Sequence, residues 1–353
     1  MATAYHLMRQ HQNKDATKRL IDLRSDTVTL PSAEMKEWMM SAPLGDDVYG
    51  EDQTINLLEQ TVAQKLGKEA GLFVSSGTQS NLLAMLSHCG RGEEYLVGDQ
   101  YHIYVDEAGG PAVLGSLVSC VLETNELGAL APEQIRNAIK EDDPHYAITR
   151  LLCLENTVGG VAQSVESLRQ LTATAKEGGL LCHLDGARLM NAAVALGVEA
   201  SKIADSFDSV CMCLSKGLGA PVGSVLSGSK DFINRARRNR KLVGGGMRQA
   251  GILAAAGLYA LEHNIARLAQ DHAKAAQLAE SLADIEQLKV TQHTNMVFIE
   301  LSIDDQISFL EHMAKHDILI GAPAPVARLV AHLDTTEADI EKVAIVVRKY
   351  FHH

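Results

Sequence analysis

Aromatic residues are scarce in this chain. They make up 4% of its 353 residues and include a single Trp, so stacking surfaces for single-stranded bases are poorly supplied. Basic residues are also in the minority, with 32 Lys and Arg against 44 Asp and Glu, which gives a formal charge of -12. Such a balance does not favour binding to phosphate backbones or anionic lipids. We therefore expect neither nucleic acid nor a membrane as a partner.

The chain also lacks an apolar run that could cross a membrane and cysteine pairs that could hold a metal. The uncharged stretch 70–90 has small or polar residues at its centre, 75–81, which hydrocarbon would not tolerate. The 6 cysteines lie mostly in apolar runs, as free thiols of a reducing compartment do. The close pair Cys211 and Cys213 does not have the Cys-x-x-Cys spacing of zinc sites. We expect a cytoplasmic protein without a bound metal.

The first 20 residues contain no apolar core, which excludes a secretory signal. A flexible N-terminal extension is the favoured interpretation of residues 1–20, and an organelle presequence remains open. The length predicts one large and one small domain. We place the large domain at 21–250, and a linker helix with a small C-terminal domain at 251–353.

Short apolar runs alternate with helical patterns between residues 70 and 250. The runs are continuous rather than alternating in polarity, which is typical of strands covered on both faces. They lie at 71–74, 94–97, 117–122, 150–155, 180–184 and 209–214. The Gly-rich tract 217–228 predicts tight turns. The large domain is therefore predicted to be α/β, with a mostly parallel sheet between helices.

The C-terminal part has its own α/β pattern. Residues 251–282 have helical spacing without proline and predict one long helix or two joined helices. Strands are expected at 296–301 and 328–332, with a helix at 307–316 between them. A closing helix is predicted to begin at Thr336, where the spacing to Asp339 is that of a capping box.

Two residues that could carry chemistry follow neighbouring predicted strands. Asp185 ends one apolar run and Lys216 ends the next, and the carboxyl ends of strands in an open α/β sheet form its ligand crevice. A lone Asp there is often a helix N-cap, and a lone Lys is often a solvated loop tip. Together they match the demands of pyridoxal phosphate, which needs a Lys for its aldehyde and a carboxylate for its ring nitrogen.

The segment Ser76-Gly77-Thr78 could hold the phosphate of that cofactor. It follows the strand 71–74 and opens a helix, so its hydroxyls and N–H groups lie at a positive helix end. The same three residues also make an ordinary N-cap. A dinucleotide is a poorer interpretation, because the glycines at 217, 219 and 223 lack the G-x-G-x-x-G spacing.

Six motifs in order resemble the low-specificity threonine aldolases. They occupy 22–29, 45–50, 76–81, 184–188, 214–217 and 244–249, and the resemblance extends over about residues 21–350. It implies the aspartate-aminotransferase-like fold, fold type I, with a seven-stranded sheet. It further implies a pyridoxal-phosphate-dependent enzyme that cleaves β-hydroxy-α-amino acids to glycine and an aldehyde.

The resemblance also assigns roles to individual residues. It implies a Schiff base between Lys216 and the cofactor, catalytic roles for His102 and His145 near the cofactor ring and the substrate hydroxyl, and a bond from Asp185 to the pyridine nitrogen. The implied binding residues are Ser76, Gly77 and Thr78 for the phosphate, Arg188 for the ring's phenolic oxygen, and Ser25, Arg188, Arg328 and Tyr49 for the substrate. The base for the β-hydroxyl is a histidine, or a water that a histidine positions.

A second subunit is implied by the same resemblance. It places Lys241 and Arg248 at the phosphate of a neighbouring subunit's cofactor and Tyr49 near the partner's site, so the sites of a dimer would be shared, and a tetramer is expected. The alternative for the basic run 235–241 is a solvated helical face. Glycines 244–246 are then a turn that allows close backbone approach.

The chain departs from the family pattern at Val158, where the family often has a histidine. This change puts the pocket for the β-substituent, and hence the stereochemical preference, in question. The expected substrates are L-threonine and L-allo-threonine. The alternatives are another pyridoxal-phosphate-dependent lyase or aminotransferase, and an inactive binding protein on the same scaffold.

Overall fold

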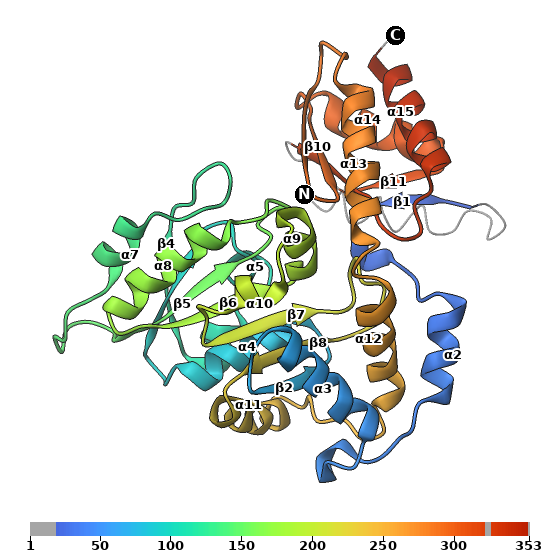
Figure 1. Cartoon of the computed structure of the whole chain (residues 1–353). Helices are drawn as coiled ribbons and strands as arrows, with labels where there is room; N and C mark the ends of the chain where they lie inside the picture. Colours follow the sequence, from blue (N-terminus) through green and yellow to red (C-terminus); the bar gives the residue numbers. More distant parts are fainter. Residues whose placement is uncertain (1–18, 322–325, 352–353) are drawn as a thin grey trace. The chain divides into compact units, whose positions relative to one another are not determined.

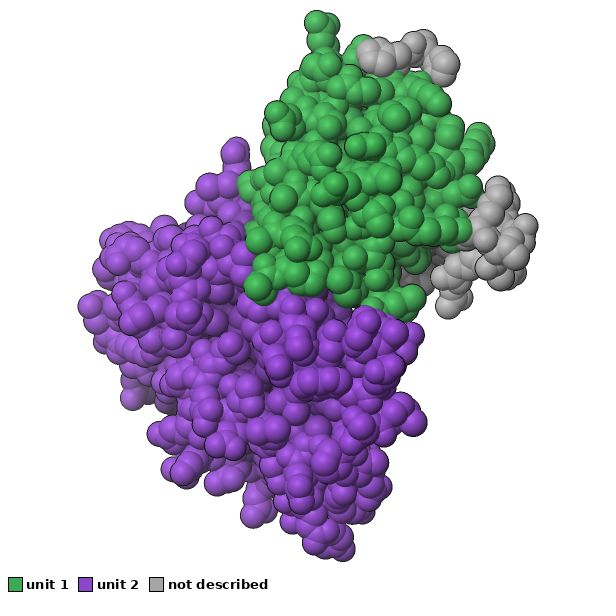
Figure 2. All heavy atoms as spheres, turned by 45° about the vertical axis from the view of Figure 1, so that its right-hand side comes forward, with its two compact units in different colours: residues 1–30, 266–353 green, residues 31–265 purple. Residues whose placement is uncertain are grey.

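The computed structural model describes residues 19–321 and 326–351 (Figure 1). They form two compact units, which Figure 2 shows in different colours: the described residues up to Leu30 and from Ala266 onward make up unit 1, and Pro31–Ile265 make up unit 2. The N-terminal extension predicted at 1–20 lies outside the described residues except for residues 19 and 20. Among the described residues no helix combines the length and the apolar character needed to cross a membrane.

Unit 2 contains a seven-stranded sheet with the order β2-β8-β7-β6-β5-β3-β4. Strand β8 runs antiparallel to both of its neighbours and all other pairs are parallel. The strands are β2 (Ala70–Val74), β3 (Glu94–Gly98), β4 (Val118–Leu122), β5 (Thr149–Glu155), β6 (Leu181–Gly186), β7 (Ser209–Cys213) and β8 (Ser224–Gly228). The predicted mostly parallel, seven-stranded α/β sheet is confirmed.

Helices cover both faces of this sheet, as strand β2 shows. Leu72 and Val74 pack with α4 (Gly77–His88) and α11 (Lys230–Leu242) in one buried cluster. Successive strand residues point to opposite faces, and the N–H of Phe73 donates to Glu59 of α3 (Gln53–Lys65). The strand is therefore enclosed between α4 and α11 on one side and α3 on the other.

The remaining helices of unit 2 follow the alternation with strands that the sequence predicts. They are α2 (Ala33–Ser41), η3 (Asp47–Tyr49), α5 (His102–Val105), α6 (Gly110–Gly115), α7 (Pro132–Ala138), α8 (Val165–Glu177), α9 (Leu189–Leu196), α10 (Ala200–Ala204) and α12 (Gly251–His263). Helix α12 packs on α2 and α3 (Figure 1).

One strand of the sheet in unit 2 was not predicted. The tract 217–228, for which the sequence predicts tight turns, contains β8. Val225 and Leu226 are its apolar pair, and the buried residues around them are the small Ser224, Ser227 and Gly228. So short an apolar run gives no strand signal, because the sheet buries this segment through small side chains rather than large ones.

Unit 1 has two small sheets around its own core. Three antiparallel strands have the order β12-β10-β9, and β1 pairs with β11 in parallel. The elements are β1 (Ile21–Leu23), η2 (Asp26–Val28), α13 (Leu268–Leu282), β9 (Lys289–His293), β10 (Met296–Glu300), α14 (Asp305–Lys315), β11 (Ile318–Ile320), β12 (Val326–Val330) and α15 (Glu337–Phe351). The predicted capping box before α15 is present, with Thr336 N–H donating to Asp339 and Asp339 N–H to Thr336 Oγ1.

The unit boundaries differ from the predicted division at residue 250. The helical stretch 251–282 is two helices, of which α12 belongs to unit 2 and α13 to unit 1. The segment 21–30 also belongs to unit 1, because β1 pairs with β11, with Ile21 opposite Ile318. Apolar periodicity identifies strands but not their distant partners, so the sequence could not show this pairing.

Candidate active site

Asp185 and Lys216 lie at the same edge of the sheet in unit 2. Asp185 is near the carboxyl end of β6, in register with Cys211 of the parallel strand β7, and Lys216 lies in the bend that follows β7. Asp185 is 2% exposed and Lys216 is partly buried. Because parallel strands end at one edge, both side chains lie at this edge of the sheet.

Two groups among the described residues donate hydrogen bonds to the Asp185 carboxylate. Asn81 Nδ2 donates to Oδ2 over 2.8 Å, and the N–H of Ala187 donates to Oδ1 over 3.0 Å. A carboxylate offers about four acceptor sites, so these bonds fix its orientation and leave acceptor capacity for a ligand.

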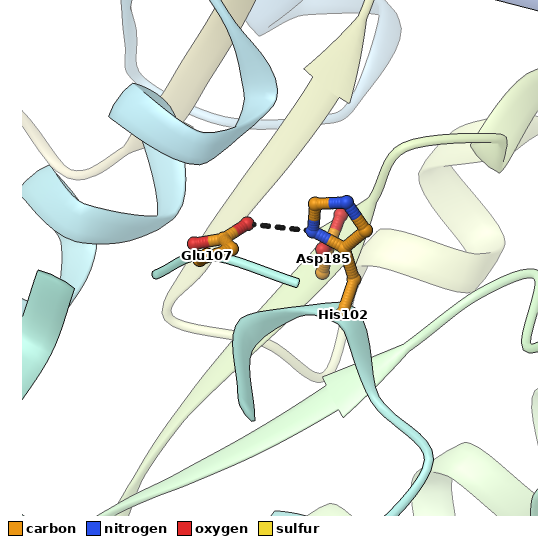
Figure 3. Close-up of side chains that lie close together, drawn as sticks. All are labelled: His102, Glu107 and Asp185. Carbon is orange, nitrogen blue, oxygen red and sulfur yellow. Dashed lines mark hydrogen bonds and ion pairs between the residues drawn. The ribbon is translucent and has the colours of Figure 1, made fainter. Parts of the chain in front are cut away.

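His102 lies beside Asp185 at the start of α5 (Figure 3). One ligand atom from each of His102, Glu107 and Asp185 lies within 4.8 Å of the others. His102 Nδ1 is 2.9 Å from Oε1 of the buried Glu107, and this bond raises the pKa of His102. With Nδ1–H donating to the carboxylate, the neutral ring has its basic lone pair on Nε2.

Glu107 and Glu155 complete this acidic environment. Asn81 Nδ2 also donates to Glu107 Oε1 over 2.8 Å, and burial raises the pKa of Glu107. Glu155, opposite Asp185 in the β5–β6 register, accepts the N–H of His102 over 2.7 Å. Burial first and the charge of Asp185 second raise the pKa of Glu155 to about 8, while the charge of Lys216 opposes the shift.

Sequence reasoning did not assign Asn81, Glu107 or Glu155 to the site. Asn81 closes the motif 76–81 and Glu155 ends a predicted strand, so their positions gave a signal that could have been used. Glu107 follows the short helix α5 in a segment without apolar periodicity, and nothing in the sequence distinguishes it from a solvated Glu.

The N-terminus of α4 has the features of an anion site. Ser76 caps the helix by accepting the N–H of Gln79 over 3.1 Å, whereas the first N–H groups of a helix, here those of Gly77 and Thr78, have no acceptor within it. A Cβ on Gly77 would lie 2.7 Å from Cys213 Sγ. Glycine therefore lets the helix start pack directly on the end of β7, near Lys216.

Arg188 is partly buried at the N-cap position of α9, close in sequence to Asp185. It follows the carboxyl end of β6 directly. The structure thus places Arg188 at the edge of the sheet that carries Asp185.

The residues that are expected to reach the site of a neighbouring subunit lie on the surface of unit 2. Tyr49 is 75% exposed, Lys241 is exposed at the end of α11, and the exposed Arg248 forms an ion pair of 2.9 Å with Asp46. Residues 244–246 form a turn in which the backbone comes close to a neighbouring side chain, as predicted. Its first glycine has φ of +77°, and a Cβ on its second would lie 2.2 Å from Gln79 Nε2.

Ser25 and Arg328 belong to unit 1. Ser25 caps η2 by accepting the N–H of Thr27 over 3.2 Å. Arg328 lies on β12, and its Nη2 is 3.4 Å from the carbonyl oxygen of Arg24. The structure therefore brings these two predicted substrate residues close together within one unit.

His145 is not brought to Asp185 within this chain. It lies in the loop before β5, is 84% exposed, and bonds through Nδ1 to Asp143 over 2.6 Å. Strand β5 begins at Thr149, near the end of α7, and reaches the site edge only at Glu155. At about 3.3 Å per residue the length of the strand separates His145 from the site.

Val158 packs into the adjoining loop. It is buried, forms an isolated bridge with Val161, and leaves so little room that a Cβ on Gly128 would lie 2.4 Å from its Cγ1. In this position the side chain closes the loop around Gly128.

Comparison with known proteins places this fold and site in one class. Residues 22–304 match the family of beta-eliminating lyases. The low specificity L-threonine aldolase of Escherichia coli K12 is 50% identical over 325 residues, 92% of this chain and 97% of that protein. The probable low-specificity L-threonine aldolase 2 of Arabidopsis thaliana is 43% identical over 349 residues, 95% of this chain and 98% of that protein. The chain therefore belongs to the low-specificity L-threonine aldolase family of lyases.

Solved structures agree in fold. The threonine aldolase of Leishmania major has a TM-score of 0.80 at 21% identity, covering 94% of this chain and 99% of that chain. The L-allo-threonine aldolase studied from Listeria monocytogenes has a TM-score of 0.77 at 20% identity, with coverage of 98% and 99%. Both share the α/β architecture described above.

Proposed function

We propose that the chain cleaves β-hydroxy-α-amino acids such as L-threonine and L-allo-threonine to glycine and an aldehyde, with pyridoxal phosphate as its cofactor. The observation that carries the proposal is the meeting of Asp185, Lys216 and the N-terminus of α4 at one edge of the sheet. The family relatives, which are named as threonine aldolases, support the substrate class.

The donors at this edge fit pyridoxal phosphate. The amine of Lys216 would hold its aldehyde, the buried Asp185 its ring nitrogen, and Arg188 its phenolic oxygen. Ser76, Gly77 and Thr78 would hold the phosphate at a helix N-terminus. When bound, this cofactor supplies a sink for the electrons left on Cα when the Cα–Cβ bond breaks.

We infer that His102 is the base for the β-hydroxyl proton. Its bond to Glu107 leaves Nε2 as the basic atom and raises the pKa of the ring. Proton transfer to Nε2, directly or through one water, is within the ordinary range of general base catalysis.

Residues of unit 1 are proposed to bind the substrate carboxylate. The guanidinium of Arg328 offers a planar pair of N–H groups, which suits a carboxylate better than a Lys ammonium does. Ser25, held near Arg328 through the carbonyl of Arg24, adds a hydroxyl.

We propose that the active assembly is a dimer with shared sites, arranged further as a tetramer. A cationic hollow of about 520 Å³ on unit 2 supports this proposal, and its lining includes Arg238, Lys241 and Gly246. The exposed Tyr49 and Arg248 belong to neighbouring segments of unit 2. A role for His145 in catalysis requires a neighbouring subunit, because the length of β5 separates it from the site of its own chain.

The reduced, mostly buried cysteines support a cytoplasmic location.

Product analysis tests the proposed reaction. Purified protein with pyridoxal phosphate is incubated separately with L-threonine and L-allo-threonine, and acetaldehyde, glycine, pyruvate and 2-oxobutyrate are measured. We expect acetaldehyde and glycine in equal amounts, abolished in Lys216→Ala and retained in the surface control Lys202→Ala. A keto acid without aldehyde would instead support an eliminating lyase or an aminotransferase, and no product of either kind would support a binding protein.

A further inference from the structure

A buried hydrogen-bonded chain leads away from Asp185 between α4 and the sheet. Asn81 of α4 donates to Asp185, and its Oδ1 lies 3.1 Å from His183 Nε2 on β6. His183 Nδ1 lies 2.8 Å from the hydroxyl of Ser209 on β7, which lies 2.7 Å from His88 Nε2 at the end of α4. The side chains of Asn81, His183 and Ser209 are buried.

The chemistry of these groups fixes the direction of every bond. Asn81 Oδ1 can only accept, so His183 carries its proton on Nε2. The Nδ1 of a neutral ring then accepts, so the Ser209 hydroxyl donates to it and is left to accept from Nε2–H of His88. Each link therefore donates toward Asp185, from His88 at the far end to Asn81 at the near end.

Two further observations agree with this direction. Burial lowers the pKa of His183 to about 3 and that of His88 to about 4, so both rings are neutral near pH 7. His88 Nδ1 is buried and, among the described residues, has no hydrogen-bond partner. Because no acceptor lies near Nδ1, the single ring proton of neutral His88 is expected on Nε2, from which it donates to Ser209.

We propose that Asn81 and His183 are positioning residues for Asp185, and that the chain from His88 through Ser209 holds this carboxylate as an oriented acceptor for the cofactor's ring nitrogen. The proposal rests on the proposed cofactor, because the carboxylate is oriented toward a ligand. It assigns a role to buried residues that the proposed function does not use. In a low-dielectric interior, hydrogen bonds connected in a chain of this kind polarise and strengthen one another.

The first test reads the histidine tautomers directly. In 15N-histidine-labelled full-length protein loaded with pyridoxal 5'-phosphate, long-range proton–nitrogen spectra are recorded from pH 6 to 9. Signals are assigned by their loss in His183→Gln and His88→Gln. We expect both rings to be neutral Nε2–H tautomers throughout, and Ser209→Ala to shift the His183 nitrogens. A His183 ring protonated on Nδ1, or titrating in this range, would overturn the proposal. The spectra of cofactor-free protein decide the direction of the chain even if the proposed function fails.

The second test measures what the chain does for the cofactor. Spectral titration gives the pyridoxal 5'-phosphate dissociation constant and the pH midpoint of the bound absorbance band. We expect Asn81→Leu to weaken binding about tenfold or more, as loss of a hydrogen bond to a charged group does. His183→Phe, which removes a bond to the neutral Asn81, should weaken binding less, and both variants should shift the midpoint. His183→Gln, which can still donate to Asn81, should recover most of the affinity.

Ser227→Ala is the matched control for Ser209→Ala. Ser227 is also a buried sheet serine, on β8, and its hydroxyl has no partner among the described residues. We expect Ser227→Ala to leave both quantities unchanged and Ser209→Ala to shift the absorbance midpoint. The unfolding temperatures of His183→Phe and Ser209→Ala are measured to confirm that both variants fold like the wild type. If these folded variants had the same pyridoxal 5'-phosphate dissociation constant and the same absorbance midpoint as Ser227→Ala, the network would be structural only and the proposal wrong.

Discussion

Substitution of Gly77 by Ala tests how the phosphate end of the site is built. The added Cβ would lie 2.7 Å from Cys213 Sγ, about 1 Å inside an ordinary van der Waals contact. Gly77 is not among the glycines with positive φ, so the sulfur contact and not the backbone opposes alanine. Cys213 is buried on β7, so relief requires the start of α4 to move. Overpacking of this kind costs about 1–3 kcal/mol.

This cost should appear in cofactor binding, because the moving groups are the N–H donors of the proposed phosphate site. We expect Gly77→Ala to raise the pyridoxal phosphate dissociation constant about 5- to 150-fold, measured by spectral titration. Cys213→Ala removes the obstructing sulfur, so the double variant should bind better than the two separate effects predict. Gly90→Ala, at a glycine with only ordinary contacts, is the control. If the two effects added within about 0.5 kcal/mol, the Cys213 sulfur would not be what opposes Ala at position 77, since residues in contact should couple.

Further predictions concern individual side chains. Asp185→Asn should keep bound cofactor but lose most turnover, because the amide cannot hold the ring nitrogen protonated; near-normal kcat would contradict this role. Arg328→Ala should raise KM for amino-acid substrates about 10- to 100-fold through the lost charged hydrogen bonds, and unchanged KM would place the carboxylate site elsewhere. Glu107→Gln replaces the charged acceptor that raises the pKa of His102 by a neutral amide oxygen, so the pKa of His102 should fall. Since the base must be neutral, the acid limb of kcat/KM should move to lower pH, and a limb that stays in place would exclude His102 as the titrating base.

The parts of the fold that the sequence predicts are those encoded by large apolar side chains. Runs such as 151–154 become fully enclosed strands, and their continuous apolarity is visible without a structure. Strand β8 escapes because it is buried through Ser224 and Ser227, and small residues resemble a loop. The place of β1 in unit 1 depends on a pairing between Ile21 and Ile318, which local pattern cannot reveal.

The same distinction applies to the site. Asp185 and Lys216 could be predicted because each ends a strand, and strand ends meet at one edge. Glu107 and His183 could not, because they come from separate elements and meet Asn81 only through tertiary packing. The hydrogen-bond partners of a buried polar residue are a property of the fold, so only the structure identifies them.

The most direct test of the central claim is to locate the cofactor on the chain. The protein is incubated with pyridoxal phosphate, reduced with borohydride, digested, and the modified peptide is identified by mass spectrometry. We expect one phosphopyridoxyl group per chain, on Lys216, and none in Lys216→Ala. Stoichiometric modification of another lysine, or equal labelling of the wild type and Lys216→Ala, would contradict this expectation.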